Sequence, residues 1–358
     1  MKIAHLICPM KLYGKEKWLL ALLRHLDRSR CASLVIPLID VESFPLADVL
    51  RRYGIEYRTV MVSGRFSYRG IREIVDFVKS EGIDILHSHD YKSDLFALAA
   101  RCGVRVKLVS TPHGWSNERD AKLQCYQILD QMALGMFDHV VPLSTHVDKS
   151  LKFVRRTRRT MIKNFIDVTD IAVADTVDET LVSYVGRLTA LKRVEDAIAA
   201  LAYTKDPALR LQVIGDGPLA DDLRRLATRL GVEKRVSFLG FRSDALPLLG
   251  ASAALVLPSL TEGTSRILME AMAMGKPVIG TDVRGINNLI EHDVTGILVP
   301  VKDPRSIARA LDRVTADRVY SRSIGNAARD SIVKNRSAAV IVKEYERLYE
   351  RVLSGARR

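Results

Sequence analysis

The strongest constraint on the fold is an alternation of short apolar segments with longer amphipathic ones along the whole chain. Short apolar segments predict buried strands, and apolar residues three and four positions apart predict helices between them. Strands that alternate with helices of about 10–15 residues are typical of βαβ units and parallel sheets. In the first half the predicted strands are KIAHLI, SLVIPLI, YRTVMV, DILHSH, KLVST and DHVVPLS, and the predicted helices are Lys17–His25, Arg69–Ser80 and Tyr91–Arg101.

A second series of strands occupies the second half of the chain. It consists of TLVSYVG, LQVIGDG, VSFLG, ALVLPS, PVIGTD and GILVP. The stretch between the two series, Ile162–Asp178, turns polar and breaks the alternation. A chain of 358 residues is long enough for about two domains. We therefore predict an α/β protein with two doubly wound domains.

Two helices near the C-terminus are predicted from local signals. Asp303 is placed to cap a helix whose first turn holds Pro304, which needs no amide donor there. The last helix carries one apolar stripe, which predicts that it packs against a domain. The stripe consists of Ile341, Tyr345, Leu348 and Val352.

Composition excludes several classes of protein. The chain is 47% hydrophobic and 27% charged, and none of its apolar runs approaches the ~20 residues that span a bilayer. Its N-terminus is expected to form a buried strand rather than a signal peptide. The four cysteines are scattered without a CxxC pair, which predicts neither a zinc knuckle nor a disulfide framework and favours a reducing, cytoplasmic setting.

The net charge of +13 points to an anionic partner. The segment 149–163 holds seven basic residues and no acid, with Leu151, Phe153 and Val154 between them. This segment is either a solvated surface or a docking site on an anionic membrane, where each basic residue contributes about 1 kcal/mol. Nucleic acid is not expected, because aromatic residues make up 6% of the chain and it carries no recognised nucleic-acid-binding motif.

The loops that follow the strands of the second half carry ligand-type residues. Ligands of open α/β sheets bind beyond the carboxyl ends of the strands. Arg187 and Lys192 follow one strand, the loop GDGP follows the next, and Phe241–Arg242 follow a third. GDGP lacks the full GxGxxG pattern, so its glycines either approach a ligand or only make a sharp bend.

The stretch TEGTSRILMEAMAMGKPVIG combines a strand-to-helix turn with a helix that is apolar nearly all round. Gly263, Thr264 and Ser265 lie at the predicted helix start, where amides and the helix dipole favour an anion. Glu270 falls inside the buried helix and must have partners. Those partners are either a ribose diol or a buried Arg and backbone amides.

Taken together, these motifs resemble the retaining glycosyltransferases of family 4, which have the GT-B fold. Glu262 and Glu270 reproduce the E-x7-E motif of that family, and EAMAMGKPVIGTDVRGINNLI is similar to its flanking segment. GRL…K at Gly186–Lys192, IGDGP, SFLG and TGILVPVKDP also fit, and so do DILHSHDYKSDLFA and TPHGW in the first half. The resemblance implies two Rossmann-like domains facing across a cleft that holds the active site.

The resemblance also implies domain limits and site residues. An acceptor-side domain would span 1–165, a donor domain 166–335, and a C-terminal helix at 336–358 would pack back toward the first domain. The implied catalytic residues are His113, Arg187, Lys192 and Glu262. The implied substrate-binding residues are Gly14, Gly215, Gly217, Phe241, Arg242, Gly263, Thr264, Ser265 and Glu270.

In the roles that the resemblance implies, Arg187 and Lys192 hold the donor diphosphate in place of a metal ion, so that no cofactor is needed. The GDGP loop and the Phe241–Arg242 backbone hold the nucleobase, and Glu270 accepts hydrogen bonds from the ribose. Glu262 and the Gly263–Ser265 amides face the transferred sugar or its phosphate. His113 bonds a sugar hydroxyl near the anomeric carbon, and Gly14 lets the backbone approach the diphosphate or acceptor.

The chain departs from the family pattern at three places. The first loop, KLYGKEKW, has one glycine where the family commonly has two. Thr264–Ser265 replace the common FG, and Phe165 follows Asn164 where the family often has NG. Arg266 and Arg284 add positive charge nearby, and they either favour an acidic acceptor or pair with acids.

The predicted function is transfer of a sugar, with retained configuration, from a UDP-, GDP- or ADP-sugar to a glycan or lipid-linked acceptor of cell-surface polysaccharide or glycolipid synthesis. The protein is expected in the cytoplasm or on the inner membrane face. One alternative is a GT-B sugar-nucleotide epimerase, for which the sequence offers no convincing acid/base set. The other is a non-catalytic nucleotide-sugar-binding protein, against which the intact Arg187, Lys192, Glu262 and Glu270 argue.

Overall fold

The computed structural model describes residues 1–9, 14–40, 44–62, 67–114, 121–171 and 176–355. These residues form two compact units, one of residues 1–164 with 338–358 and the other of residues 165–337. Unit 1 therefore contains the C-terminal helix as well as the N-terminal half of the chain. Each unit has its own hydrophobic core.

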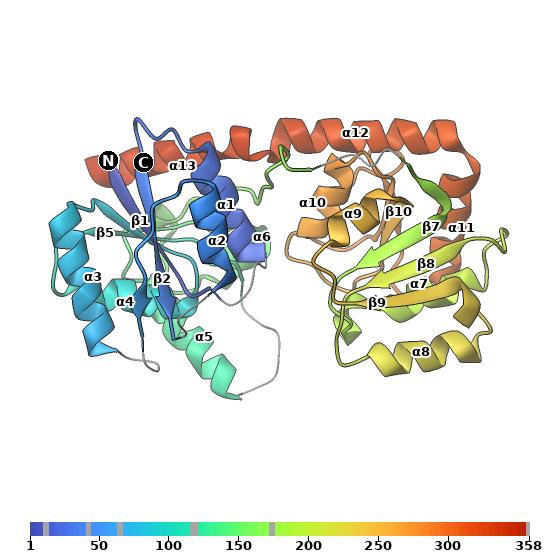
Figure 1. Cartoon of the computed structure of the whole chain (residues 1–358), viewed down its shortest axis with the longest axis horizontal. Helices are drawn as coiled ribbons and strands as arrows, with labels where there is room; N and C mark the ends of the chain where they lie inside the picture. The colour runs from blue at the N-terminus through green and yellow to red at the C-terminus, as the bar shows by residue number, and fades with distance from the viewer. Residues whose placement is uncertain (10–13, 41–43, 63–66, 115–120, 172–175, 356–358) are drawn as a thin grey trace. The chain divides into compact units, whose positions relative to one another are not determined.

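Unit 1 is built on a parallel sheet of six strands in the order β3-β2-β1-β4-β5-β6 (Figure 1). The strands are β1 (Lys2–Ile7), β2 (Ala32–Ile39), β3 (Val60–Met61), β4 (Ile85–Ser88), β5 (Lys107–Ser110) and β6 (His139–Val140). The helices are α1 (Gly14–His25), α2 (Pro45–Arg52), α3 (Tyr68–Glu81), α4 (Tyr91–Arg101), α5 (Ala121–Leu134), α6 (Thr145–Ser150) and α13 (Ala338–Ser354), with a 3₁₀ turn at Arg156–Arg158.

Unit 2 repeats the same topology, with the sheet order β12-β11-β10-β7-β8-β9. Its strands are β7 (Asp178–Val185), β8 (Arg210–Ile214), β9 (Val236–Gly240), β10 (Ser252–Leu257), β11 (Val278–Thr281) and β12 (Ile297–Val299). Its helices are α7 (Val194–Leu201), α8 (Ala220–Arg229), α9 (Ala245–Gly250), α10 (Arg266–Ala273), α11 (Pro304–Ala316) and α12 (Arg318–Arg336), with 3₁₀ turns at Ala190–Lys192 and Glu233–Arg235.

The predicted fold class is confirmed: both units are doubly wound, Rossmann-like α/β domains. In each unit the chain begins at the centre of the sheet, winds outward to one edge, and returns to build the other half. The strand order therefore reverses between β1 and β4 in unit 1, and between β7 and β10 in unit 2. Ligands of such sheets bind at this switch point, beyond the carboxyl ends of the strands.

Several predicted elements differ in extent. YRTVMV and DHVVPLS each contain only a two-residue strand, β3 and β6, because these edge strands have a single neighbour and Pro142 lacks an amide donor. Helices α2, α5 and α6 were not predicted. The first predicted helix begins one turn earlier, at Gly14.

Both predicted helix signals near the C-terminus are confirmed. The Asp303 side chain accepts a hydrogen bond from the Ser306 amide at 3.0 Å and caps α11, which begins at Pro304. The apolar stripe of α13 is buried from Ile341 to Val352. Helix α13 packs on α1, so its stripe completes the core of unit 1.

Candidate active site

The switch point of unit 2 brings together loops that the sequence singles out. The loop after β7 carries Arg187 and Lys192, and the turn after β10 carries Glu262. The Lys192 ammonium donates to the Glu262 carboxylate at 2.5 Å and so links the two loops. The Leu260 amide also donates to the Leu191 carbonyl at 2.8 Å. Lys192 and Glu262, 70 positions apart in the chain, thus form an ion pair that joins the two loops.

The loop after β7 is held by a buried side chain on one side and is exposed to solvent on the other. The buried Tyr184 hydroxyl donates to the Arg187 carbonyl at 3.1 Å and so holds the backbone of this loop. Burial first, and then the nearby Glu262 and Glu195, raise the pKa of Tyr184, so its hydroxyl remains a donor. The Arg187 side chain is exposed. Its guanidinium therefore lies on the solvent side of an anchored loop.

The two glycines of GDGP are required by packing within the protein. A Cβ at Gly215 would lie 1.9 Å from the Gly186 carbonyl oxygen, and a Cβ at Gly217 would lie 2.4 Å from the Leu188 carbonyl oxygen. Backbone hydrogen bonds from Gly186 to Ile214 and from Leu188 to Asp216 join the two loops. The close approach of the two backbones therefore explains both glycines without any contact to a ligand.

The loop after β9 presents an exposed aromatic ring. Phe241 has 65% of its surface exposed. The Arg242 guanidinium makes two hydrogen bonds to Asp244, at 2.7 and 2.6 Å, and these bonds raise the pKa of Arg242. The side chain of Arg242 is thus engaged locally, which leaves its backbone for any nucleobase contact.

The turn before α10 holds Glu262 and leaves space beside it. Glu262 accepts from the Ser259 hydroxyl at 3.0 Å as well as from Lys192. Gly285 packs closely on this turn, since a Cβ there would lie 2.4 Å from the Glu262 carbonyl oxygen. Gly263 differs, because no described atom lies within 4 Å of its ideal Cβ position. Packing does not require a glycine at 263, so the space above it is available to a ligand.

Helix α10 begins immediately after this turn. Ser265 is the N-cap residue, and its side chain makes no capping hydrogen bond. The first amides of α10 therefore offer donors to a ligand. Within the helix, Glu270 is buried and accepts from the Arg266 guanidinium at 2.8 Å. Of the two partners foreseen for Glu270, an arginine is present, and Arg266 is thereby paired with an acid.

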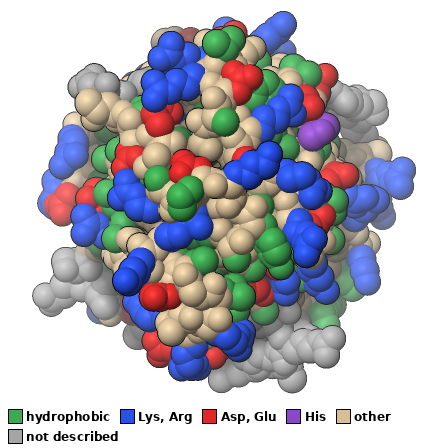
Figure 2. Space-filling model, turned by 90° about the vertical axis from the view of Figure 1, so that its right-hand side faces the viewer, with side chains coloured by type: hydrophobic (Ala, Val, Ile, Leu, Met, Phe, Trp, Pro, Cys, Tyr) green, Lys and Arg blue, Asp and Glu red, His purple; other side chains and the backbone are tan. Residues whose placement is uncertain are grey.

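The second added charge, Arg284, behaves differently from Arg266. It is exposed and makes no ion pair with any residue that the structure describes. On the face of the molecule in Figure 2, Lys and Arg side chains are separated by acids and apolar side chains.

In unit 1, His113 follows β5 and is half-buried. Its neighbour Gly114 has a φ of 110°, a conformation that favours glycine and accounts for the HG pair. The Trp18 ring packs edge-on against His113, with centroids 5.0 Å apart. Trp115 and residues 11–13 of the KLYGKEKW loop lie outside the described residues, as do 172–175 of the predicted join. Gly14 is exposed, and no described atom lies within 4 Å of its ideal Cβ position.

Three buried histidines, His5, His87 and His89, place one ring nitrogen each within 4.8 Å of one another. Such a set could hold a transition metal. In this structure, however, both nitrogens of His87 are bonded to hydroxyl groups at 2.8 Å, and His5 bonds His89 at 3.1 Å. Burial lowers the pKa of all three, that of His5 to about 3, so they are neutral. We interpret them as a hydrogen-bonded core cluster.

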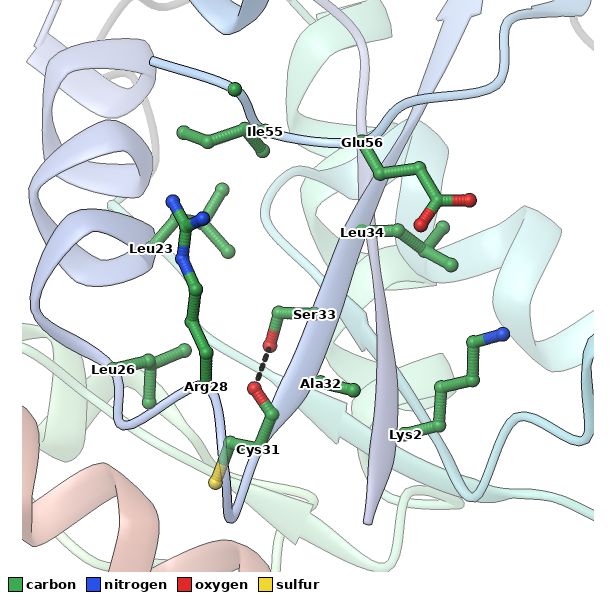
Figure 3. Close-up of a pocket in the computed structure, with 11 residues that line it drawn as sticks. Lys2, Leu23, Leu26, Arg28, Cys31, Ala32, Ser33, Leu34, Ile55 and Glu56 are labelled. Atoms are coloured by element: carbon green, nitrogen blue, oxygen red, sulfur yellow. Dashed lines mark hydrogen bonds between the residues drawn. The ribbon is translucent and has the colours of Figure 1, made fainter.

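A pocket of about 230 Å³ lies elsewhere in unit 1 (Figure 3). It is lined by residues at the amino ends of β1 and β2, among them Lys2, Ala32 and Leu34. This is the edge of the sheet opposite to the switch point. The pocket is therefore separate from the candidate active site.

Comparisons with known proteins identify the family of the chain. A family model described as "Glycosyltransferase Family 4" matches residues 13–170, and one described as "Glycosyl transferases group 1" matches residues 169–331. Together they cover residues 13–331, which include most of both units. The chain belongs to the family 4-like glycosyltransferases and is an enzyme of that class.

Relatives and solved structures resemble the chain over most of its length. It is 28% identical to the N-acetyl-alpha-D-glucosaminyl L-malate synthase of Bacillus anthracis over 78% of each chain. It is 29% identical to the UDP-Gal:alpha-D-GlcNAc-diphosphoundecaprenol alpha-1,3-galactosyltransferase of Escherichia coli over 88% of each. The crystal structure of Anabaena HepE in complex with UDP has a TM-score of 0.80 at 22% identity, over 98% of this chain and 100% of that one.

Some residues at the two switch points were not found from the sequence. In unit 1, the Lys15 ammonium pairs with Asp90 at 2.9 Å across the loops after β1 and β4. In unit 2, Ser259 and Gly285 support the Glu262 turn. Gly285 had a signal, since it lies in the polar turn after PVIGTD. Lys15 had none beyond its place after a strand.

Proposed function

We propose that this glycosyltransferase moves a sugar from a nucleoside-diphosphate sugar to a glycan or lipid-linked acceptor with retention of configuration. The observation that carries the proposal is the unit 2 switch point. There Arg187, Lys192, Glu262, open Gly263 and the uncapped start of α10 lie on adjoining loops. Cations and amides are the groups that bind a diphosphate. The named activity of the Escherichia coli relative, which uses UDP-Gal, makes UDP-sugars the first donors to test.

In the proposed reaction, the acceptor hydroxyl attacks the anomeric carbon from the face that the leaving group occupies. A bond forms between the acceptor oxygen and the anomeric carbon, the bond to the diphosphate oxygen breaks, and a phosphate oxygen takes the hydroxyl proton. Arg187 and Lys192 stabilise the charge that develops on the diphosphate, without a metal ion. Neither Glu262 nor Glu270 acts as a covalent nucleophile.

The two acids of the E-x7-E motif have cationic partners within the protein. Lys192 neutralises Glu262, and Arg266 neutralises Glu270. We propose that the donor enters by drawing Lys192 from Glu262 toward the diphosphate. Glu262 then accepts from the sugar hydroxyls, while Glu270 keeps Arg266 and turns its second oxygen to the ribose. His113 and Gly14 of unit 1 contribute to the sugar and acceptor sites.

The test of this function is release of sugar from UDP-, GDP- and ADP-sugars by wild type and by Glu262→Ala. Wild type should hydrolyse one donor class slowly without an acceptor, and the variant should lose at least about 100-fold in kcat. If the variant turned over the donor as fast as wild type, the role proposed for Glu262 would be wrong. A thermal shift with nucleotide but no sugar release by wild type would favour a binding protein instead.

We further propose that unit 1 docks on an anionic membrane where the acceptor is lipid-linked. Lys149, Lys152, Arg155, Arg156, Arg158 and Lys163 of the basic segment are exposed, whereas Arg159 pairs with Asp148. Phe153, in their midst, is 52% exposed, and its backbone lies against Gly135 at the end of α5. Ile128, Leu129, Met132 and Met136, on and just after α5, are also exposed. Among the described residues, no helix is both long and apolar enough to cross a bilayer.

Sedimentation with vesicles tests this docking. Wild type should bind phosphatidylglycerol vesicles at low salt and leave them at high salt, because screening weakens the attraction. Phe153→Ser should bind more weakly, whereas Val319→Ser, which changes an exposed apolar residue of unit 2, should bind like wild type. No sedimentation at low salt would overturn the docking proposal without affecting the proposed reaction.

A further inference from the structure

The C-terminal helix does more in unit 1 than bury an apolar stripe. Two tyrosines of α13, Tyr345 and Tyr349, are fully buried among the aromatic side chains behind His113. The Tyr349 hydroxyl lies 2.8 Å from Nδ1 of His87, and the other ring nitrogen of His87 lies 2.8 Å from the Thr111 hydroxyl. One imidazole ring therefore joins α13 to the end of β5.

The position of Thr111 determines where His113 begins. The Thr111 amide donates to the Ser88 carbonyl at 3.0 Å, so Thr111 is held through its backbone as well as its hydroxyl. Pro112, with a restricted φ, is the single residue between Thr111 and His113. A displacement of the Thr111 backbone should therefore displace His113 by a similar amount.

A second set of contacts reaches His113 from the side. The Tyr345 ring packs edge-on against Trp18, with centroids 5.5 Å apart and an interplanar angle of 72°. Trp18 in turn packs edge-on against His113, with an angle of 82°. Aromatic pairs at these distances and angles are attractive and fix ring orientation. Backbone and ring of His113 are thus supported from the same helix.

Hydrogen bonds within this cluster are costly to lose. His87, Thr111 and Tyr349 are buried, so water cannot replace a missing partner, and an unmatched polar group in such a place is strongly unfavourable. His87 is neutral, since burial first and then the nearby His5 and His113 lower its pKa. It can therefore donate through one nitrogen and accept through the other, which links both hydroxyl groups through one ring.

We infer that Tyr349, acting through His87 and Thr111, and Tyr345, acting through Trp18, are positioning residues that hold His113 in the orientation the reaction requires. This inference rests on the role proposed for His113. The segment that follows α12 and ends the chain thereby becomes part of the catalytic apparatus. From the sequence, α13 was predicted only to pack against a domain through its apolar stripe.

A double-mutant cycle on hydrolysis of the preferred donor tests the inference. We expect His113→Ala to lower kcat about 100-fold, and Tyr349→Phe to lower it about tenfold through misplacement alone, with KM within about twofold. The double variant should be no slower than His113→Ala, because Tyr349 acts only through His113. Tyr68→Phe, which removes the hydroxyl of an exposed tyrosine of α3, is the matched control and should leave kcat unchanged.

A readout without substrate separates this inference from the proposed function. The His113 ring signal in a ¹H–¹³C NMR spectrum should shift in Tyr349→Phe and not in Tyr68→Phe. Thr111→Val breaks the same path at another residue and should reproduce both effects, so poor folding of one variant leaves the other to decide. Unchanged kcat in folded Tyr349→Phe, or losses that simply add, would overturn the inference alone. Full activity of His113→Ala would overturn it together with the role of His113.

Discussion

The two units place a lysine–carboxylate pair at the same point of the same topology. In unit 1, Lys15 and Asp90 join the loops after β1 and β4, and in unit 2, Lys192 and Glu262 join the loops after β7 and β10. The surroundings of the two pairs differ. Asp90 also accepts from the Cys8 amide at 2.8 Å and from the Ser93 amide at 3.0 Å, which makes it the cap of α4.

The two pairs occupy one topological position but are bonded differently, and we propose that the pair in unit 1 serves stability and the pair in unit 2 catalysis. Burial disfavours the charged form of Asp90, but Lys15 and the two amides outweigh burial, and the pKa of Asp90 is lowered. Glu262, in contrast, precedes its helix, leaves the first amides of α10 uncapped, and stands beside the open position at Gly263. The carboxylate of the pair in unit 1 also caps a helix, whereas the pair in unit 2 lies beside an uncapped helix start.

The largest expected effect comes from removing the unit 2 lysine. Lys192→Met should lower kcat for donor hydrolysis about 100- to 1,000-fold, since the charge developing on the diphosphate loses a cation. Its melting temperature should stay near that of wild type, because the pair is partly exposed. Lys234→Met, at an exposed lysine of unit 2, is the control for charge. If Lys192→Met lowered the melting temperature but not kcat, the unit 2 pair would serve stability, as the unit 1 pair does.

The next effect concerns the unit 1 carboxylate. Asp90→Ala removes the carboxylate that Lys15 and two amides share, and should lower the free energy of unfolding by about 3 kcal/mol. Asp303→Ala removes a comparable cap in unit 2, without a lysine partner, and should cost about 1 kcal/mol. Urea unfolding of both variants measures the difference. Equal costs would mean that the Lys15 pair adds nothing to the cap.

Acid should weaken the two units unequally. The folded pKa values of His5, His87 and His89 lie below the ordinary value of 6.5. The unfolded chain therefore binds more protons as the pH falls below that value, and each of these histidines costs about 1.3 kcal/mol between pH 7 and 5.5. Asp94 of unit 1, with a pKa raised by burial and by Asp130, opposes part of this loss.

Hydrogen exchange of the strand amides at the two pH values measures this effect. Protection of β1 and β4 should fall more than that of β7 and β10, since His292, the one histidine of unit 2, is exposed. An equal loss in both units would show that the buried histidines gain protons in the folded state.

The smallest effect tests the partner of Glu270. Arg266→Leu should raise KM for the donor about fivefold, equivalent to the loss of one hydrogen bond of about 1 kcal/mol that orients the carboxylate. Arg284→Leu, at an exposed position without a described ion pair, is the control. An unchanged KM in Arg266→Leu would mean that Glu270 is oriented by the helix alone.

Much of the fold could be predicted from the sequence, because buried strands such as Ser252–Leu257 are short and almost wholly apolar. Helix α5 was missed because its apolar residues point in several directions, and Ile128, Leu129 and Met132 are exposed. The edge strands β3 and β6 of unit 1 were predicted too long, since pairing with a single neighbour ends sooner there than the apolar pattern does.

For the site, motif and loop position identified Arg187, Lys192 and Glu262 but not their contacts. The pairing of Lys192 with Glu262 depends on two loops that meet only when β7 and β10 pair. The glycines of GDGP illustrate the same limit. Their packing against residues 186–188 is a tertiary contact, so the pattern alone could not tell a ligand position from a tight approach of two loops.

The central claim is that the donor binds at the switch point of unit 2, and hydrogen exchange of the intact wild type with and without nucleotide tests it most directly. UDP, GDP and ADP would each be added at about 100 times the dissociation constant, where binding contributes about 2.7 kcal/mol. One nucleotide should slow exchange in residues 186–192, 214–219 and 260–268. Protection confined to the loops after β1 and β4, or no protection in those three segments of unit 2, would contradict the claim.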